Sequence, residues 1–195
     1  MTVIIDGSAS AEFETPLPLT EGGTGAVSAA AAATAIAPIQ LQTAVASTSG
    51  TSIDFTGIPS WVKRITVMFQ NVSSSGTSNW QIQLGTASSI ETTGYQAVST
   101  YGPALGTGTI TTGFPVYNDG GTNTKSGALT FSLLNSSTNI WVCSGNVGQF
   151  VGSANYTMNT CGDKTLSGVL TRLRLTTVNG TDAFDAGSIN ISWEF

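Results

Sequence analysis

The sequence predicts an all-β protein: an antiparallel β-sandwich of jelly-roll type in residues 51–195, preceded by an extended N-terminal segment, residues 1–50, with a short Ala-rich helix. Three observations lead to this prediction. After residue 50, apolar side chains recur at every second position, clusters of Gly, Ser, Asn and Asp separate these runs, and no run has the spacing of an amphipathic helix. Many short strands with turn-forming connections are typical of sandwiches and jelly rolls.

The N-terminal segment combines residues that favour extended chain with a run of alanines. Prolines fix their own φ and keep the preceding residue out of the helical region, while glycines allow positive φ. The alanines at 26–37 predict a short helix that ends before Pro38. This segment has too little side-chain bulk for its own core, so we expect it to pack against copies of itself or against a partner. The residues that define its backbone are Pro16, Pro18, Gly22, Gly23 and Gly25.

The period-two runs after residue 50 predict strands with one buried face. The final run reaches the last residue, so we expect removal of the last few residues to prevent folding. Trp61 is expected to pack inside, whereas Trp141 is out of phase with Ile140 and Val142 and is expected to face another subunit. The predicted inward positions are Ile65, Val67 and Phe69; Trp80, Ile82 and Leu84; Leu129, Phe131 and Leu133; Thr171, Leu173 and Leu175; and Ile189, Ile191, Trp193 and Phe195.

Composition argues against most enzyme classes and against nucleic-acid binding. The chain has no histidine, only 9% charged residues and a formal net charge of -5. A Ser-His-Asp or Cys-His arrangement is therefore impossible, and the few basic residues form no patch for phosphates. No apolar run is long enough to span a membrane, and no signal peptide is evident, so export by the standard route is not expected. The sequence predicts a non-enzymatic protein without cofactor, metal, nucleic acid or membrane insertion.

Carboxylates remain as candidates for glycosidase-type chemistry, which needs two of them. Asp119 and Asp163 lie in turn-like sequences that favour aspartate for backbone hydrogen bonds. Asp182 and Asp185 follow the basic run around Arg172 and Arg174, where an ordinary loop or salt-bridge role is favoured. The acidic candidates are Glu91, Asp119, Asp163, Asp182 and Asp185.

The two cysteines and three tyrosines leave alternatives open. Cys143 and Cys161 could pair if adjacent strands bring them together, although two reduced, buried thiols are favoured. Tyr95, Tyr101 and Tyr117 lie near Gly-rich loops, where an exposed ring could stack on a sugar. Ordinary surface is the alternative for these rings.

Two parts of the chain are similar to bacteriophage fibre proteins. Residues 16–26, PLPLTEGGTGA, followed by alanines, resemble a segment found in many tailed-phage tail-fibre and virion-fibre proteins. Residues 58–67, 90–95 and 173–190 are similar to C-terminal domains of phage fibre-like proteins.

The resemblance implies a virion structural protein, commonly a homotrimer, that is assembled in the host bacterial cytoplasm. Its N-terminal segment would attach to other virion proteins, and its C-terminal sandwich would form the head. Because the chain has no repeated shaft, we expect a short tail or capsid fibre that mediates attachment to the host surface, with a surface glycan as a candidate receptor. The alternative is a capsid decoration or cement protein that stabilises the shell or a tail joint. A polysaccharide depolymerase is the third possibility.

Overall fold

The computed structural model describes residues 28, 32, 36–37, 39–101, 109–152 and 155–195. The chain divides into two compact units, Met1–Gln40 and Leu41–Phe195. Composition placed the division near residue 50, ten residues later. Most of the predicted Ala-rich helix lies outside the described residues, as do the predicted attachment residues Pro16, Pro18, Gly22, Gly23 and Gly25.

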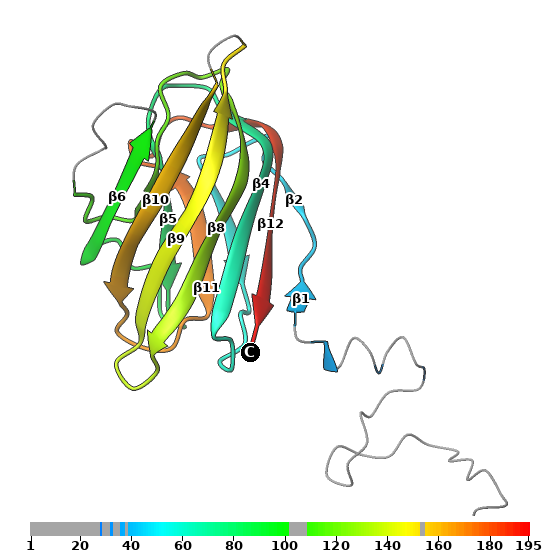
Figure 1. Ribbon diagram of the computed structural model, residues 1–195, viewed down its shortest axis with the longest axis vertical. Helices are drawn as coiled ribbons and strands as arrows, with labels where there is room; N and C mark the ends of the chain where they lie inside the picture. Colours follow the sequence, from blue (N-terminus) through cyan, green and yellow to red (C-terminus); the bar gives the residue numbers. More distant parts are fainter. Residues whose placement is uncertain (1–27, 29–31, 33–35, 38, 102–108, 153–154) are drawn as a thin grey trace, which may run out of the picture. The chain divides into compact units, whose positions relative to one another are not determined.

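The described part of the second unit is all-β and consists of two antiparallel sheets, as predicted (Figure 1). In the larger sheet the order is β12-β4-β8-β9-β10-β6, and β2 also pairs with β12; the smaller sheet has the order β3-β11-β5-β7. Figure 1 shows the strands of the larger sheet side by side, with β5 and β11 behind them. The strands are β1 (Ile39–Leu41), β2 (Val45–Ala46), β3 (Ser52–Thr56), β4 (Arg64–Ser74), β5 (Trp80–Gly85), β6 (Tyr95–Tyr101), β7 (Phe114–Val116), β8 (Thr124–Asn135), β9 (Ile140–Phe150), β10 (Tyr156–Thr165), β11 (Arg172–Thr177) and β12 (Phe184–Glu194).

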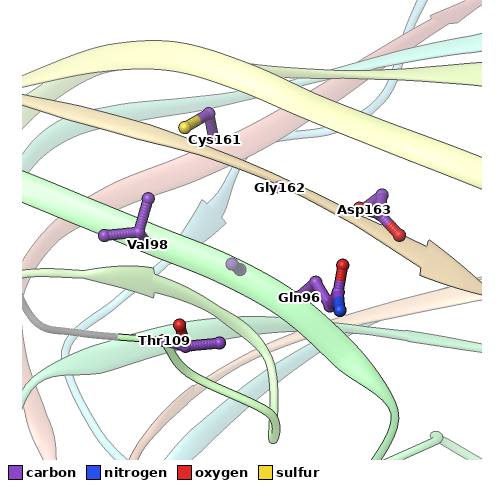
Figure 2. A pocket seen from close by; sticks show the side chains of 7 residues that line it. Gln96, Val98, Thr109, Cys161, Gly162 and Asp163 are labelled. Carbon is purple, nitrogen blue, oxygen red and sulfur yellow. The ribbon is translucent and has the colours of Figure 1, made fainter.

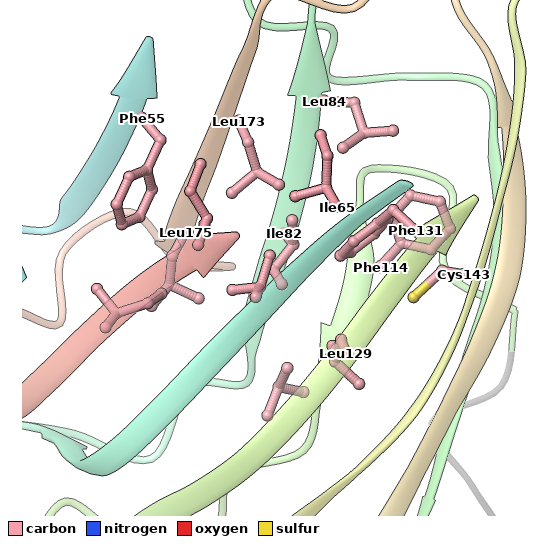
Figure 3. Close-up of a cluster of buried hydrophobic side chains, with 14 of the residues drawn as sticks. Phe55, Ile65, Ile82, Leu84, Phe114, Leu129, Phe131, Cys143, Leu173 and Leu175 are labelled. Carbon is pink, nitrogen blue, oxygen red and sulfur yellow. The ribbon is translucent and has the colours of Figure 1, made fainter. Parts of the chain in front are cut away.

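The core lies between the two sheets, because alternate side chains of each strand point to one face (Figure 3). Phe114 of the smaller sheet contacts Phe131 of the larger one edge to face, with ring centroids 5.2 Å apart. The inward positions predicted in β4, β5, β11 and β12 are buried, as are Leu129 and Phe131 of β8. Leu133 and Thr171 are only partly buried.

Three of the aromatic predictions are wrong. Phe195 is 81% exposed and Trp61 is 37% exposed, and their rings contact each other with centroids 6.5 Å apart. The reason is that β12 ends at Glu194, so Phe195 lies beyond the last paired residue. Trp141, expected to face another subunit, is instead buried in the core of its own chain, because it shares the inner face of β9 with Cys143.

The cysteines do not form a disulfide. β9 and β10 are adjacent, but their register pairs Cys161 with Ser144 and Cys143 with Gly162. This offset of one residue places the two side chains on opposite faces of the sheet. The favoured prediction of reduced thiols is confirmed, whereas burial holds only for Cys143, since Cys161 is exposed.

Candidate functional site at one end of the sandwich

The two carboxylates suspected of chemistry near the C-terminus have local hydrogen-bonding roles. Asp182 Oδ2 accepts a hydrogen bond from the backbone N–H of Ser78 at 3.0 Å, and its Oδ1 accepts one from Asn179 Nδ2 at 2.9 Å. The hydrogen bond from Asn179 is the largest cause of a lowered pKa for Asp182. Asp185 accepts a hydrogen bond from the Ser73 hydroxyl. The contacts of Asp182 fit the loop role that the sequence favoured. For Asp185 the loop position is wrong, because this residue lies in β12.

The neighbouring arginines have other partners. Arg174 forms a bidentate ion pair with Asp54, at 2.6 and 2.7 Å, and Arg172 donates to the carbonyl of Ala87 at 2.8 Å. Among the described residues, therefore, neither Asp182 nor Asp185 forms a salt bridge.

Tyr95 is not a surface ring, and the prediction of an exposed stacking position there is wrong. Its side chain is 1% exposed, and its ring contacts Phe114 edge to face at 5.2 Å. The hydroxyl accepts from the Leu84 N–H and donates to the Glu91 carbonyl, both at 2.8 Å. Lys164 forms an ion pair with Glu91 at 2.6 Å and lies 5.3 Å from the Tyr95 ring centroid. Burial raises the pKa of the Tyr95 hydroxyl. Tyr95 is therefore a packing residue of the core.

The other two predicted tyrosines meet at one end of the sandwich. Tyr101 ends β6 and Tyr117 follows β7, and their rings stack with centroids 3.8 Å apart and planes 9° apart. Tyr156, at the start of β10, contacts Tyr101 edge to face at 6.4 Å. All three residues are partly buried. A hydrogen bond with Tyr101 is the largest cause that raises the pKa of Tyr117 to about 12.

Strand register explains how Tyr156 joins this cluster. Tyr101 of β6 pairs with Met158 of β10. Tyr156 precedes Met158 by two residues, so its side chain lies on the same face of the sheet as Tyr101 and Met158. Sequence reasoning missed Tyr156, although it is in phase with Met158 and Thr160, both buried.

Asn118, between Tyr117 and Asp119, fixes the chain at this end of the sandwich. Asn118 is 3% exposed and its Nδ2 donates to the carbonyls of Gly76 and Ser78, at 2.9 and 3.1 Å. Its backbone N–H donates to Asn79 Oδ1 at 2.8 Å, and its Oδ1 accepts from Lys125 Nζ at 2.6 Å. Because Asn118 is held on every side, the neighbouring Tyr117 and Asp119 are held as well.

Lys125 is the most unusual residue of this network, because its residue surface is 0% exposed. Its ammonium lies 4.2 Å from the ring centroid of Trp80, whose Nε1 donates to Ser74 Oγ at 2.9 Å. Burial lowers the pKa of Lys125 to about 7, and the negative charge of Asp119 opposes this shift. The burial of this lysine was not predicted from the sequence.

Asp119 and Gln149 form the polar side of the cluster. Asp119 is exposed, and its Oδ1 accepts hydrogen bonds from Asn123 Nδ2 at 2.8 Å and from Gln149 Nε2 at 2.7 Å. Gln149 is 0% exposed and pairs with Tyr156 across the β9–β10 ladder. Its Oε1 has no hydrogen-bond partner among the described residues. We call Tyr101, Tyr117, Tyr156, Asp119 and Gln149 the tyrosine site.

A hollow lies over β6 and β10, with a volume of about 390 Å³ (Figure 2). Among the described lining residues, Asp163 is the charged one, beside Gln96, Val98, Thr109 and Cys161. It lies in β10 and not in the turn that the sequence predicted. No group of three or more metal-ligating side chains occurs among the described residues. The tyrosine site is the richer candidate, since it combines three partly exposed rings with an exposed carboxylate.

The chain matches no protein-family model, no curated protein and no solved structure. In the described part of the chain, no helix has the length and apolar character required to cross a membrane.

Proposed function

We propose that this chain is a non-enzymatic bacteriophage virion protein, a short tail or capsid fibre whose sandwich mediates attachment to the host surface. The observation that carries the proposal is the tyrosine site: partly exposed rings and a fixed carboxylate gathered at one end of a β head. Attachment needs such a recognition surface and no catalytic group. The resemblance of residues 16–26 and 173–190 to phage fibre proteins supports the same class.

The head is proposed to be a jelly roll with insertions. In that fold the first, eighth, third and sixth strands form one sheet, and the second, seventh, fourth and fifth form the other. Counting β2, β3, β4, β5, β7, β8, β11 and β12 as these eight strands gives the orders β2-β12-β4-β8 and β3-β11-β5-β7, which agree with the observed pairings. On this assignment β6, β9 and β10 are insertions that widen the larger sheet and supply two of the three tyrosines.

The proposal includes a homotrimer that docks on other virion proteins. Apolar side chains that a monomer leaves exposed support assembly. Trp61 contacts Phe195, and Val169 shares a small hollow with Lys63 and Leu133. The large exposed apolar side chains of this region are Trp61, Leu134, Val169 and Phe195. Mass determination by light scattering on the full chain tests this part: a trimer is expected, and a monomer at micromolar concentration contradicts it.

The test of the virion assignment is immunogold electron microscopy on particles from a culture that carries the gene, with antibodies against the purified full chain. Labelled phage tails or shells are expected. If the chain occurs in the lysate and never on particles, the assignment is wrong.

Competition separates attachment from the cement alternative. Host cells incubated first with the purified chain should adsorb fewer phages, because the chain occupies the receptor. Dense labelling of the shell without any competition would instead support a decoration or cement protein, for which the exposed apolar side chains would form the docking surface.

A further inference from the structure

We propose that the tyrosine site binds a neutral saccharide and discriminates against acidic ones. This inference rests on the proposed attachment function and names the receptor chemistry that this end of the sandwich fits. The rings, the hydrogen-bond acceptors and the charge of the site each support it.

The rings provide an ordered apolar surface with polar tips. The pyranose ring of a sugar presents C–H groups that pack on an aromatic face, and Tyr combines such a face with a hydroxyl that can hydrogen-bond. Stacking of Tyr101 on Tyr117 at 3.8 Å and the edge contact from Tyr156 hold the three side chains in place. Because these rotamers are already fixed, a ligand loses less binding free energy to side-chain ordering.

The acceptors beside the rings suit the hydroxyl groups of a sugar. Two amides bind the same oxygen of Asp119, which fixes the orientation of an exposed carboxylate. Hydrogen bonds to a carboxylate are roughly twice as strong as those between neutral groups. One of these amides belongs to Gln149, which is 0% exposed and therefore holds the carboxylate in one position.

The charge of the site opposes anionic ligands. Asp119 is the charged group exposed here, whereas Lys125 is 0% exposed and is held by Asn118. Lys164 is paired with Glu91, and Arg174 is paired with Asp54. A sialylated, uronic or phosphorylated glycan would therefore meet a carboxylate without an accessible counter-charge, in a chain with a net charge of -5.

The experiment measures binding of the full chain to a panel of neutral and acidic bacterial glycans, with saturation-transfer NMR on any glycan that binds. Neutral saccharides are expected to bind, and Tyr156→Ala is expected to weaken binding at least about tenfold, as for loss of one stacking ring. Asp119→Asn should also weaken neutral binding, whereas Asn146→Ala, on the exposed face of β9 and outside the site, should leave it unchanged. Thermal unfolding of each variant establishes that it is folded. Preference for acidic glycans, or neutral binding that survives both site variants, would overturn the inference.

Binding to host cells separates this inference from the proposed function. Periodate oxidises vicinal diols of surface sugars, and protease removes surface proteins. Loss of cell binding after periodate alone is expected. Loss after protease alone would refute the saccharide and leave attachment standing, and absence of cell binding under all conditions would refute attachment itself.

Discussion

Lys125 points its ammonium at the face of Trp80, 4.2 Å from the ring centroid, although no part of the residue reaches the solvent. The contact joins β8 to β5, that is, the larger sheet to the smaller. Asn118 accepts a hydrogen bond from the same ammonium at 2.6 Å, so one buried cation connects both sheets to the chain segment that carries Tyr117 and Asp119.

Stability should increase with pH because of Lys125. Burial lowers its pKa from 10.5 to about 7, so between these values the unfolded chain binds a proton that the folded chain has lost. The unfolding free energy then rises with pH, by up to about 1 kcal/mol per pH unit for one proton. Urea unfolding from about pH 7 to about pH 9 measures this slope, and Lys125→Met should flatten it. If Lys125→Met leaves the slope unchanged, groups other than Lys125 determine the pH dependence of stability.

Asn118→Ala should be among the most destabilising single substitutions at this end. It leaves the Lys125 ammonium and the carbonyls of Gly76 and Ser78 without their partner. We expect a loss of about 3 kcal/mol or more in unfolding free energy, measured by urea denaturation. Asn146→Ala, on the exposed face of β9, is the matched control and should change stability by no more than about 0.5 kcal/mol. Equal effects would refute the anchoring role of Asn118.

Period-two patterning predicted the sheets well, because it reports directly which face of a strand is buried. It also contained the signal for the buried lysine. Lys125 is in phase with Leu129 and Phe131, so the pattern places it on the inner face, where a lysine is rarely found. What the pattern cannot supply is the partner, since Trp80 and Asn118 come close only after both sheets have formed.

The tyrosine site was only partly predictable, because contacts between strands are not visible in the local sequence. Tyr101 and Tyr117 were identified from their position near loops, but local sequence cannot distinguish them from Tyr95, whose hydroxyl finds buried partners. Tyr156 depends on the register of β10 against β6, which is a property of strand pairing.

The two thiols should differ in reactivity. Cys161 is exposed, whereas Cys143 is buried and burial raises its pKa. In native protein a thiol reagent such as DTNB should modify one thiol per chain rapidly, and Cys161→Ser should abolish this fast reaction. The second thiol should react only in denaturant. Fast modification of both thiols, or of neither, would contradict the assignment.

Gly187 should not tolerate alanine. It has φ +87° at an irregularity of β12, and an added Cβ would overlap the carbonyl oxygen of Asn71. Gly187→Ala is expected to lower the unfolding free energy by at least about 2 kcal/mol, since backbone strain and a clash add. Gly180→Ala, at φ +68° with nothing within 4 Å of its Cβ, is the control and should lose only about 1 kcal/mol. Equal losses would mean that the clash with Asn71 is relieved at no cost.

Removal of Phe195 should be tolerated, whereas removal of the Trp193 side chain should not. Phe195 is 81% exposed and lies beyond the last paired residue, Glu194. A chain that ends at Glu194 should lose less than about 1 kcal/mol, because it loses surface contacts with Trp61 and Lys63 and no buried side chain. Trp193→Ala removes a buried ring from the core and should cost about 3–5 kcal/mol. Thermal and urea unfolding of both variants measure the difference. A one-residue truncation as damaging as Trp193→Ala would contradict the exposed position of Phe195 within the chain. Light scattering of the truncated chain separately tests the part of Phe195 in the proposed trimer.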